Sequence, residues 1–159
     1  MLTSPAVGAD SVTISVDLAL ASRRVEDGYF SDRPQSEAIE SAERYRKFLT
    51  LIQRHPDAVI APTRDIDEMW HLHMLHPVAY YHDCMDSFGE IIDHDGGFGS
   101  EPDEVPVLAA TFEYTAALWR KEYDEDYLVA ESSGAVKCTR NCVSRCKRAC
   151  KTNKRADAA

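Results

Sequence analysis

The chain has 159 residues, with 44% hydrophobic and 28% charged side chains and a net charge of −9. This length allows one domain with its own hydrophobic core and is short for two. No run approaches the roughly 20 apolar residues that a transmembrane helix needs, and residues 1–22 lack the basic start of a signal peptide. We therefore expect a protein without a membrane span that resides in the cytoplasm.

The charge is distributed unevenly along the chain. Residues 137–155 hold eight basic side chains and no acidic one, whereas residues 1–136 hold ten basic and 26 acidic side chains and so carry a net charge of −16. We interpret this asymmetry as an acidic body at residues 1–130, a linker at residues 131–136 and a basic tail at residues 137–159. The tail can fold back on the body or bind an anionic partner.

The body begins with alternating apolar residues, which are Val12, Ile14, Val16, Leu18 and Leu20. This period of two is typical of a short strand or an extended segment lying on the domain, although the same residues also fit the start of a helix. A helix is predicted over residues 36–54, because acidic side chains gather at its start and basic ones at its end. Its expected apolar face consists of Ile39, Tyr45, Phe48, Leu49 and Ile52.

Three more helices are predicted further along the body. Thr63 is the expected N-cap of a helix over residues 64–75 or 64–76, and a proline in the first turn starts another over residues 77–88 or beyond. Glycines and prolines predict a loop over residues 94–106, and the last helix runs from residue 107 to about residue 130. The expected core residues of these helices are Met69, Trp70, Leu72, Leu75, Leu108, Phe112, Leu118 and Trp119. The fold class is thus mainly α, a small helical domain with a short extended N-terminal segment and a cysteine-rich basic C-terminal tail.

Residues 65–95 concentrate metal-ligating side chains. They hold five of the six histidines and the one cysteine outside the tail, which are His71, His73, His76, His82, His94 and Cys84. Imidazole, thiolate and carboxylate groups are ligands of zinc, copper and iron in proteins. The segment therefore predicts a transition-metal site, and the alternative is a set of buried histidines that hydrogen-bond to aspartate and hold two helices together.

Helical spacing divides these side chains into two sets. Asp67 and His71 are four residues apart and share one face of a helix. Because His71 and His73 lie about 200° apart around a helix axis, the two cannot both bind one ion on a regular helix. The preferred site is therefore Asp67 with His71, completed by Cys84 or His94. The alternative set consists of His73, His76 and His82.

At these residues the sequence resembles a known family. The pattern comprises Pro62, Asp65–Asp67, Trp70-His71-x-His73, Leu75, His76-Pro77, Tyr80-x-x-Asp83-Cys84, Phe88-Gly89 and Asp93-His94-Asp95. It is similar to that of the glycine-rich domain-containing protein-like family, over about residues 40–127. The resemblance implies a largely helical fold with His71, His73, Cys84 and His94 as its polar signature, and it implies no firm biochemical activity. It favours a site of His71, Cys84 and His94 with Asp67 in support.

The tail carries four cysteines spaced four residues apart, which are Cys138, Cys142, Cys146 and Cys150. On a helix over residues 135–151 they form one stripe, which suits a soft metal such as Cu(I), or zinc, and the neighbouring basic residues favour the thiolate form. The alternatives are two disulfides, a peptide substrate of a thiol-modifying enzyme, and a disordered tail that stays reduced. Paired C-x2-C spacing is absent, so no zinc finger is predicted.

Three functions are consistent with these features. The first is a metal-binding module with a His/Cys/Asp site in the body and a tail that binds soft metal or is modified. The second is a metal-dependent hydrolase or oxidoreductase at the same site, with Asp67 or Asp95 as a base. The third is a carrier or interaction protein whose tail is a peptide substrate or docks on an anionic partner. The tail has no aromatic residue to stack on bases, which argues against nucleic acid as that partner.

Overall fold

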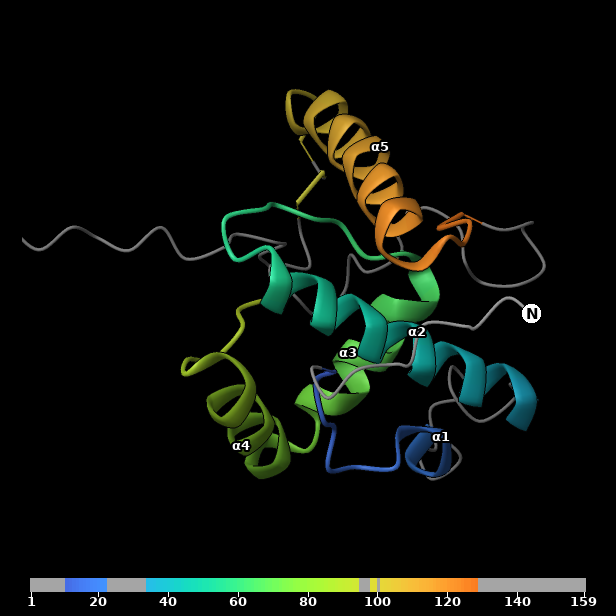
Figure 1. The fold of residues 1–159 in the computed structure, drawn as a ribbon, viewed down its shortest axis with the longest axis vertical. Coiled ribbons are helices and arrows are strands. Elements are labelled where there is room, and N and C mark those ends of the chain that lie inside the picture. The colour runs from blue at the N-terminus through green and yellow to red at the C-terminus, as the bar shows by residue number, and fades with distance from the viewer. Residues whose placement is uncertain (1–10, 23–33, 95–97, 100, 129–159) are drawn as a thin grey trace, which may run out of the picture.

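Five helices make up the described part of the chain, which comprises residues 11–22, 34–94, 98–99 and 101–128 of the computed structural model (Figure 1). In chain order they are α1 (Leu18–Ala21), α2 (Gln35–Arg54), α3 (Arg64–Met74), α4 (Pro77–Phe88) and α5 (Glu104–Tyr123). No strand occurs within these ranges, so the predicted mainly α fold is confirmed. None of the helices in these ranges combines the length and the apolar character of a membrane span. The predicted linker and cysteine-rich tail lie outside the described residues.

Helix α2 lies at the centre of the domain. It packs against α1 and α3, and α3 in turn contacts α1 and α4. Figure 1 shows α5 across α2 from α1 and α4. The core is filled by large side chains from α2, α3 and α5, which include Tyr45, Phe48, Met69, Trp70, Leu72, Phe112 and Trp119. Removing this apolar surface from water is the main contribution to the stability of the domain.

The bounds of α2, α3 and α4 follow the signals in the sequence. Helix α3 begins directly after Thr63, as predicted, but the side chain of Thr63 makes no capping hydrogen bond. Its hydroxyl instead donates to Oδ1 of Asp65 over 2.6 Å. Helix α4 begins at Pro77 and is followed by Gly89, whose φ of 74° lies in the left-handed region that favours glycine at the end of a helix.

Helix α5 and two apolar side chains differ from the prediction. The helix spans Glu104–Tyr123 instead of about 107–130, because Asp124 takes the left-handed conformation, with φ of 54°, and ends it. Ile39 and Leu75 were expected in the core, but they have exposed fractions of 56% and 65%. Ile39 lies near the start of α2, and Leu75 is the residue at which α3 ends. Their helical period is correct, but no helix among the described residues covers either position.

The N-terminal segment is extended as one of the two readings predicted, and it forms no strand. It leads into the short helix α1, which Asp17 caps by accepting a hydrogen bond from the backbone N–H of Leu20 over 2.9 Å. The backbone N–H of Val12 donates to Oγ1 of Thr50 on α2 over 3.1 Å. The segment is therefore fixed on the surface of the helical domain by side chains rather than by strand pairing.

Arg44 on α2 links α3 to the segment that follows α5. Its Nε donates to Oδ2 of Asp65 over 2.7 Å, and its Nη2 donates to the backbone carbonyl of Tyr127 over 2.8 Å. The guanidinium also lies 5.2 Å from the centroid of the Trp119 ring. Arg44 and Asp65 are both buried, so the pairing satisfies two charges that are costly to remove from water singly.

Candidate metal centre

One face of α3 meets the segment that follows α4, and three ligand-type side chains gather there. Asp67 and His71 are four residues apart on α3, and His94 comes from the segment after α4. Nε2 of His94 lies 2.7 Å from Oδ1 of Asp67, and Nε2 of His71 lies 3.8 Å from the same oxygen. One ligand atom from each of the three residues lies within 4.8 Å of the others. Within the described ranges, this is the one group of three such side chains at these distances.

This cluster is largely shielded from water. The side chains of His94 and Asp67 are exposed by 2% and 5%, and that of His71 by 23%. Two ring nitrogens, Nε2 of His71 and Nδ1 of His94, are buried without a hydrogen-bond partner. Because buried polar atoms in native proteins are almost always satisfied, these two nitrogens stand out as free to accept or donate a further contact.

The surroundings of His71 favour its neutral imidazole. Burial lowers the pKa of His71, the nearby carboxylate of Asp67 raises it in part, and the neighbouring ring of His94 lowers it further. His71 therefore holds its proton less tightly than an exposed histidine does. Neutral imidazole is the form that binds a metal ion.

The separations in the cluster are close to those of a metal centre. Zinc binds imidazole nitrogen and carboxylate oxygen at about 2.0–2.2 Å in tetrahedral geometry, which places ligand atoms about 3.3 Å apart. The distances from Asp67 Oδ1 to the two histidines, 2.7 Å and 3.8 Å, lie on either side of this value. The shorter contact is a hydrogen bond in the structure, which a bound ion would have to replace.

Trp70 and Tyr80 position His94. The ring of His94 lies 4.4 Å from the Trp70 ring and 4.7 Å from the His71 ring, centroid to centroid. The indole Nε1–H of Trp70 donates to the hydroxyl of Tyr80 over 2.9 Å, and that hydroxyl donates to the backbone carbonyl of Ile92. The segment that carries His94 is thereby attached to α3 and α4. Tyr80 belongs to the family pattern, but nothing in the helical spacing predicts this role for it.

Cys84 lies outside the cluster. Its side chain is buried in the core and is a free thiol. Burial raises the pKa of this thiol, whereas its contacts with the backbone of Ile92 and with the hydroxyl of Tyr80 lower it. The structure therefore joins His94, and not Cys84, to Asp67 and His71.

His73 is fully buried on another face of α3, where both of its ring nitrogens have partners. Nδ1 lies 3.0 Å from the hydroxyl of Tyr45, and Nε2 lies 3.0 Å from Oδ2 of Asp83 on α4. The same carboxylate oxygen accepts hydrogen bonds from the backbone N–H of Ser15, over 2.7 Å, and from its hydroxyl, over 3.1 Å. Burial lowers the pKa of His73, although Asp83 raises it in part. No sequence signal points to Ser15 or Tyr45 as partners, because they are distant along the chain.

The remaining candidates are not brought together. Nδ1 of His76 lies 2.9 Å from the backbone carbonyl of Leu72, within the same turn of chain. His82 is exposed on α4. The alternative set of His73, His76 and His82 forms no cluster among the described residues. The four tail cysteines, Cys138, Cys142, Cys146 and Cys150, lie outside the described residues, as does Asp95.

The fold and these contacts define a class of protein, a small helical domain in which a buried carboxylate and two imidazoles meet at one site. The model of the family described as Glycine-rich domain-containing protein-like matches residues 7–83. Over this segment the chain is similar to that family, as the resemblance predicted. The matched range begins and ends earlier than the predicted 40–127; it includes Asp67, His71 and His73, and it ends before Cys84 and His94.

Two curated relatives carry the name of the same family. They are Glycine-rich domain-containing protein 1 and Glycine-rich domain-containing protein 2, both from Arabidopsis thaliana. Each is 33% identical over 92 residues, which make up 55% of this chain and 11% or 12% of the relative. The chain thus spans little more than a tenth of the length of these relatives, and their names state no activity. No solved structure matches the chain with significant similarity.

Proposed function

We propose that the chain is a metal-binding helical module whose body site consists of Asp67, His71 and His94. The observation that carries this proposal is the meeting of three ligand-type atoms within 4.8 Å, where Nε2 of His71 is buried without a partner. The proposal leaves Cys84 and His73 out of the ligand set. Cys84 lies outside the cluster, and both ring nitrogens of His73 are already hydrogen-bonded.

The ligand set favours zinc or ferrous iron over copper. Two imidazoles and a carboxylate, with an open position, bind zinc in hydrolytic enzymes and iron in oxygenases. Cu(I) prefers thiolates, so in this chain the tail cysteines suit it better than the body site does. Zinc is the first metal to test, because it has no redox chemistry and tolerates this tetrahedral set.

The proposal extends to the tail. Cys138, Cys142, Cys146 and Cys150 would hold a soft metal or serve as sites of modification, and the basic residues around them would bind an anionic partner or the modifying enzyme. The cytoplasm, where thiols stay reduced, suits both uses.

Metal analysis of the full chain after anaerobic purification tests the body site. In wild type and in a variant with all four tail cysteines changed to serine, we expect about one zinc ion per chain at the body site. His94→Ala in the serine background should lose it. His82→Ala in the same background is the matched control, because His82 is an exposed histidine on α4 outside the cluster. Full zinc content in His94→Ala and in His71→Ala, or none in the serine variant, would refute the body site.

A second candidate function is a metal-dependent hydrolase at the same centre. Three protein ligands leave one coordination position for water. Zinc-dependent hydrolysis of p-nitrophenyl acetate that is lost in Asp67→Asn would support this function. If the zinc-loaded protein hydrolyses this ester no faster than free zinc does, the metal-binding module remains as the proposed function and the hydrolase does not.

A further inference from the structure

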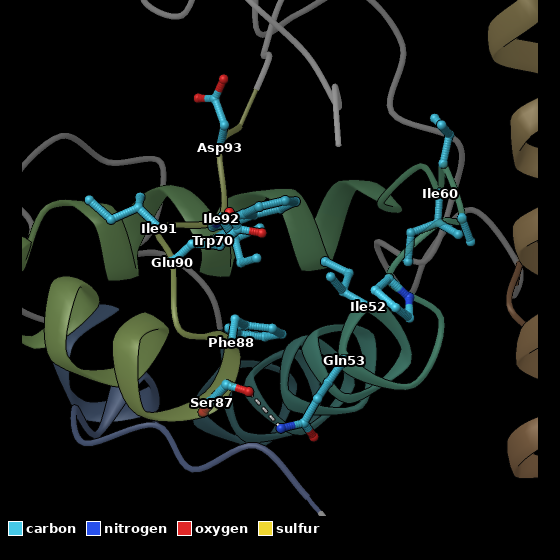
Figure 2. Close-up of a pocket in the computed structure, with 13 residues that line it drawn as sticks. Ile52, Gln53, Ile60, Trp70, Ser87, Phe88, Glu90, Ile91, Ile92 and Asp93 are labelled. Carbon is cyan, nitrogen blue, oxygen red and sulfur yellow. Dashed lines mark hydrogen bonds between the residues drawn. The ribbon is translucent and has the colours of Figure 1, made fainter. Parts of the chain in front are cut away.

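A cavity of about 210 Å³ lies beside the candidate metal centre (Figure 2). It is formed by the end of α2, residues 58–60, the end of α4 and residues 90–93. Figure 2 shows Phe88 and Trp70 on one side of it and Ile52 across from them. The walls are therefore mainly aliphatic and aromatic, as in sites for small molecules.

Trp70 is shared between the cavity and the metal centre. Its ring lines the cavity and also lies 4.4 Å from the ring of His94. None of the three candidate metal ligands lines the cavity. The cavity is thus a separate site whose contents would contact the same tryptophan.

Two large aliphatic side chains among the lining residues are exposed. Val59 has an exposed fraction of 44% and Ile91 one of 54%, and both line the cavity. They come from different segments of the chain, the link after α2 and the segment after α4. An apolar group bound against either side chain would remove it from water, which is favourable.

The charged residues of the lining are all acidic. They are Glu90 and Asp93, and no lysine, arginine or histidine lines the cavity. Figure 2 shows the carboxylate of Asp93 pointing away from Trp70 and Phe88, so Glu90 is the acidic side chain relevant to a ligand in the cavity. Asp93 accepts a hydrogen bond from the backbone N–H of His94 over 3.0 Å, whereas Glu90 is exposed and no ion pair joins it to another described residue. The resulting negative potential favours a cationic ligand and disfavours a carboxylate.

We propose that this cavity binds a small amine that carries one aromatic ring. A cavity of about 150 Å³ in a protein core holds benzene, so the present volume suits a ring with a short chain. The ring would pack on Trp70 and Phe88, and the ammonium group would lie near Glu90. This site goes beyond the proposed metal binding and does not depend on it.

Three probes of nearly equal shape test the proposal. Phenethylamine is cationic, 2-phenylethanol is neutral and phenylacetate is anionic. Binding is followed by the indole N–H signals of the two tryptophans in the full-length protein. We expect phenethylamine to shift the Trp70 signal and to leave that of Trp119, which does not line the cavity, unchanged. Phenylacetate should bind at least about fivefold more weakly than phenethylamine, and 2-phenylethanol between the two.

Two variants separate charge from shape. Glu90→Gln should reduce the preference for phenethylamine over phenylacetate, and Glu40→Gln, at an exposed position on α2 away from the cavity, should not. Ala58→Phe should fill the cavity and abolish the shift. Asp67→Asn, which removes a candidate metal ligand, should bind phenethylamine as wild type does, with or without a chelator.

Several outcomes would overturn the proposal. Equal or tighter binding of phenylacetate in wild type would refute the preference for a cation. The absence of any Trp70 shift with all three probes, or equal shifts of both tryptophans, would refute the cavity as the site. These measurements use wild type, so they decide the question even if Ala58→Phe does not fold.

Discussion

His73 joins helix α3 to helix α4 through Asp83, with Nε2 of the ring 3.0 Å from Oδ2 of the carboxylate. Ser15 from the N-terminal segment donates twice to the same oxygen, and Tyr45 from α2 lies 3.0 Å from the other ring nitrogen. Burial raises the pKa of Tyr45 well above its usual range, so its hydroxyl remains a donor. Four segments of the chain therefore meet at one buried imidazole. These contacts explain why His73 stabilises the fold although it lies only two residues from the candidate metal ligand His71.

His73→Ala should lower the free energy of unfolding by about 2–4 kcal/mol, because it leaves a cavity and removes the partner of Asp83 and Tyr45. Urea denaturation measures this change, and His82→Ala, at an exposed position, should change stability by less than about 0.5 kcal/mol. Zinc content of His73→Ala should equal that of wild type. A variant of unchanged stability that has lost its zinc would instead identify His73 as a ligand.

Arg44→Ala should be among the most destabilising substitutions in the domain. It leaves the carboxylate of Asp65, which is 1% exposed, without its ion-pair partner, and breaking a buried pair costs about 3–5 kcal/mol. Arg46→Ala on the same helix breaks an exposed pair with Glu43 and should cost less than about 1 kcal/mol. Thermal or urea unfolding of both variants makes the comparison. Similar losses in the two would show that burial of the Arg44 pair has no special role.

Tyr80→Phe should weaken metal binding without touching a ligand. It keeps the ring but removes the hydroxyl that accepts from Trp70 and donates to the carbonyl of Ile92, so the segment carrying His94 loses its attachment. We expect zinc affinity to fall about tenfold and the free energy of unfolding to fall by about 1–3 kcal/mol. Tyr81→Phe, at an exposed neighbouring position, is the control for both measurements. Unchanged zinc affinity in Tyr80→Phe would mean that His94 is positioned without this contact or does not bind the ion.

The local part of the site could be predicted from the sequence. The spacing of four residues places Asp67 and His71 on one face of a helix, and the angle between positions separates His71 from His73. The structure agrees with both points, since His71 lies near Asp67 and His73 pairs with Asp83 instead. Turn and start signals such as Pro77 also fix the helix ends, because they act through the local backbone.

The long-range part of the site could not be predicted in this way. His94 lies 27 residues after Asp67, and its placement depends on the packing of Trp70 and on a hydroxyl from α4. Helical spacing does not distinguish Cys84 from His94 as the residue that completes the site of Asp67 and His71. Only the tertiary packing shows that Cys84 lies in the core. The exposure of Leu75 has the same origin, because a helical period shows which residues share a face but not whether another helix covers that face.

Tyr123 should make stability depend on pH in the alkaline range. Its hydroxyl donates to the backbone carbonyl of Lys47 over 2.7 Å, and burial raises its pKa from 10.0 to about 12. The folded chain holds this proton more tightly than the unfolded chain, so the contribution is fully present below about pH 10 and is lost as pH rises towards about 12. Tyr123→Phe has no proton to lose, and its stability should therefore fall less than that of wild type over this range.

Urea titrations at intervals from pH 9 to pH 12 measure this effect as the difference between wild type and Tyr123→Phe. Other groups that titrate in this range contribute equally to both proteins and cancel in the difference. Tyr114→Phe is the matched control, because Tyr114 is an exposed tyrosine on the same helix, α5; its difference from wild type should stay constant with pH. A constant difference for Tyr123→Phe as well would show that the folded chain does not retain this phenolic proton more tightly than the unfolded one.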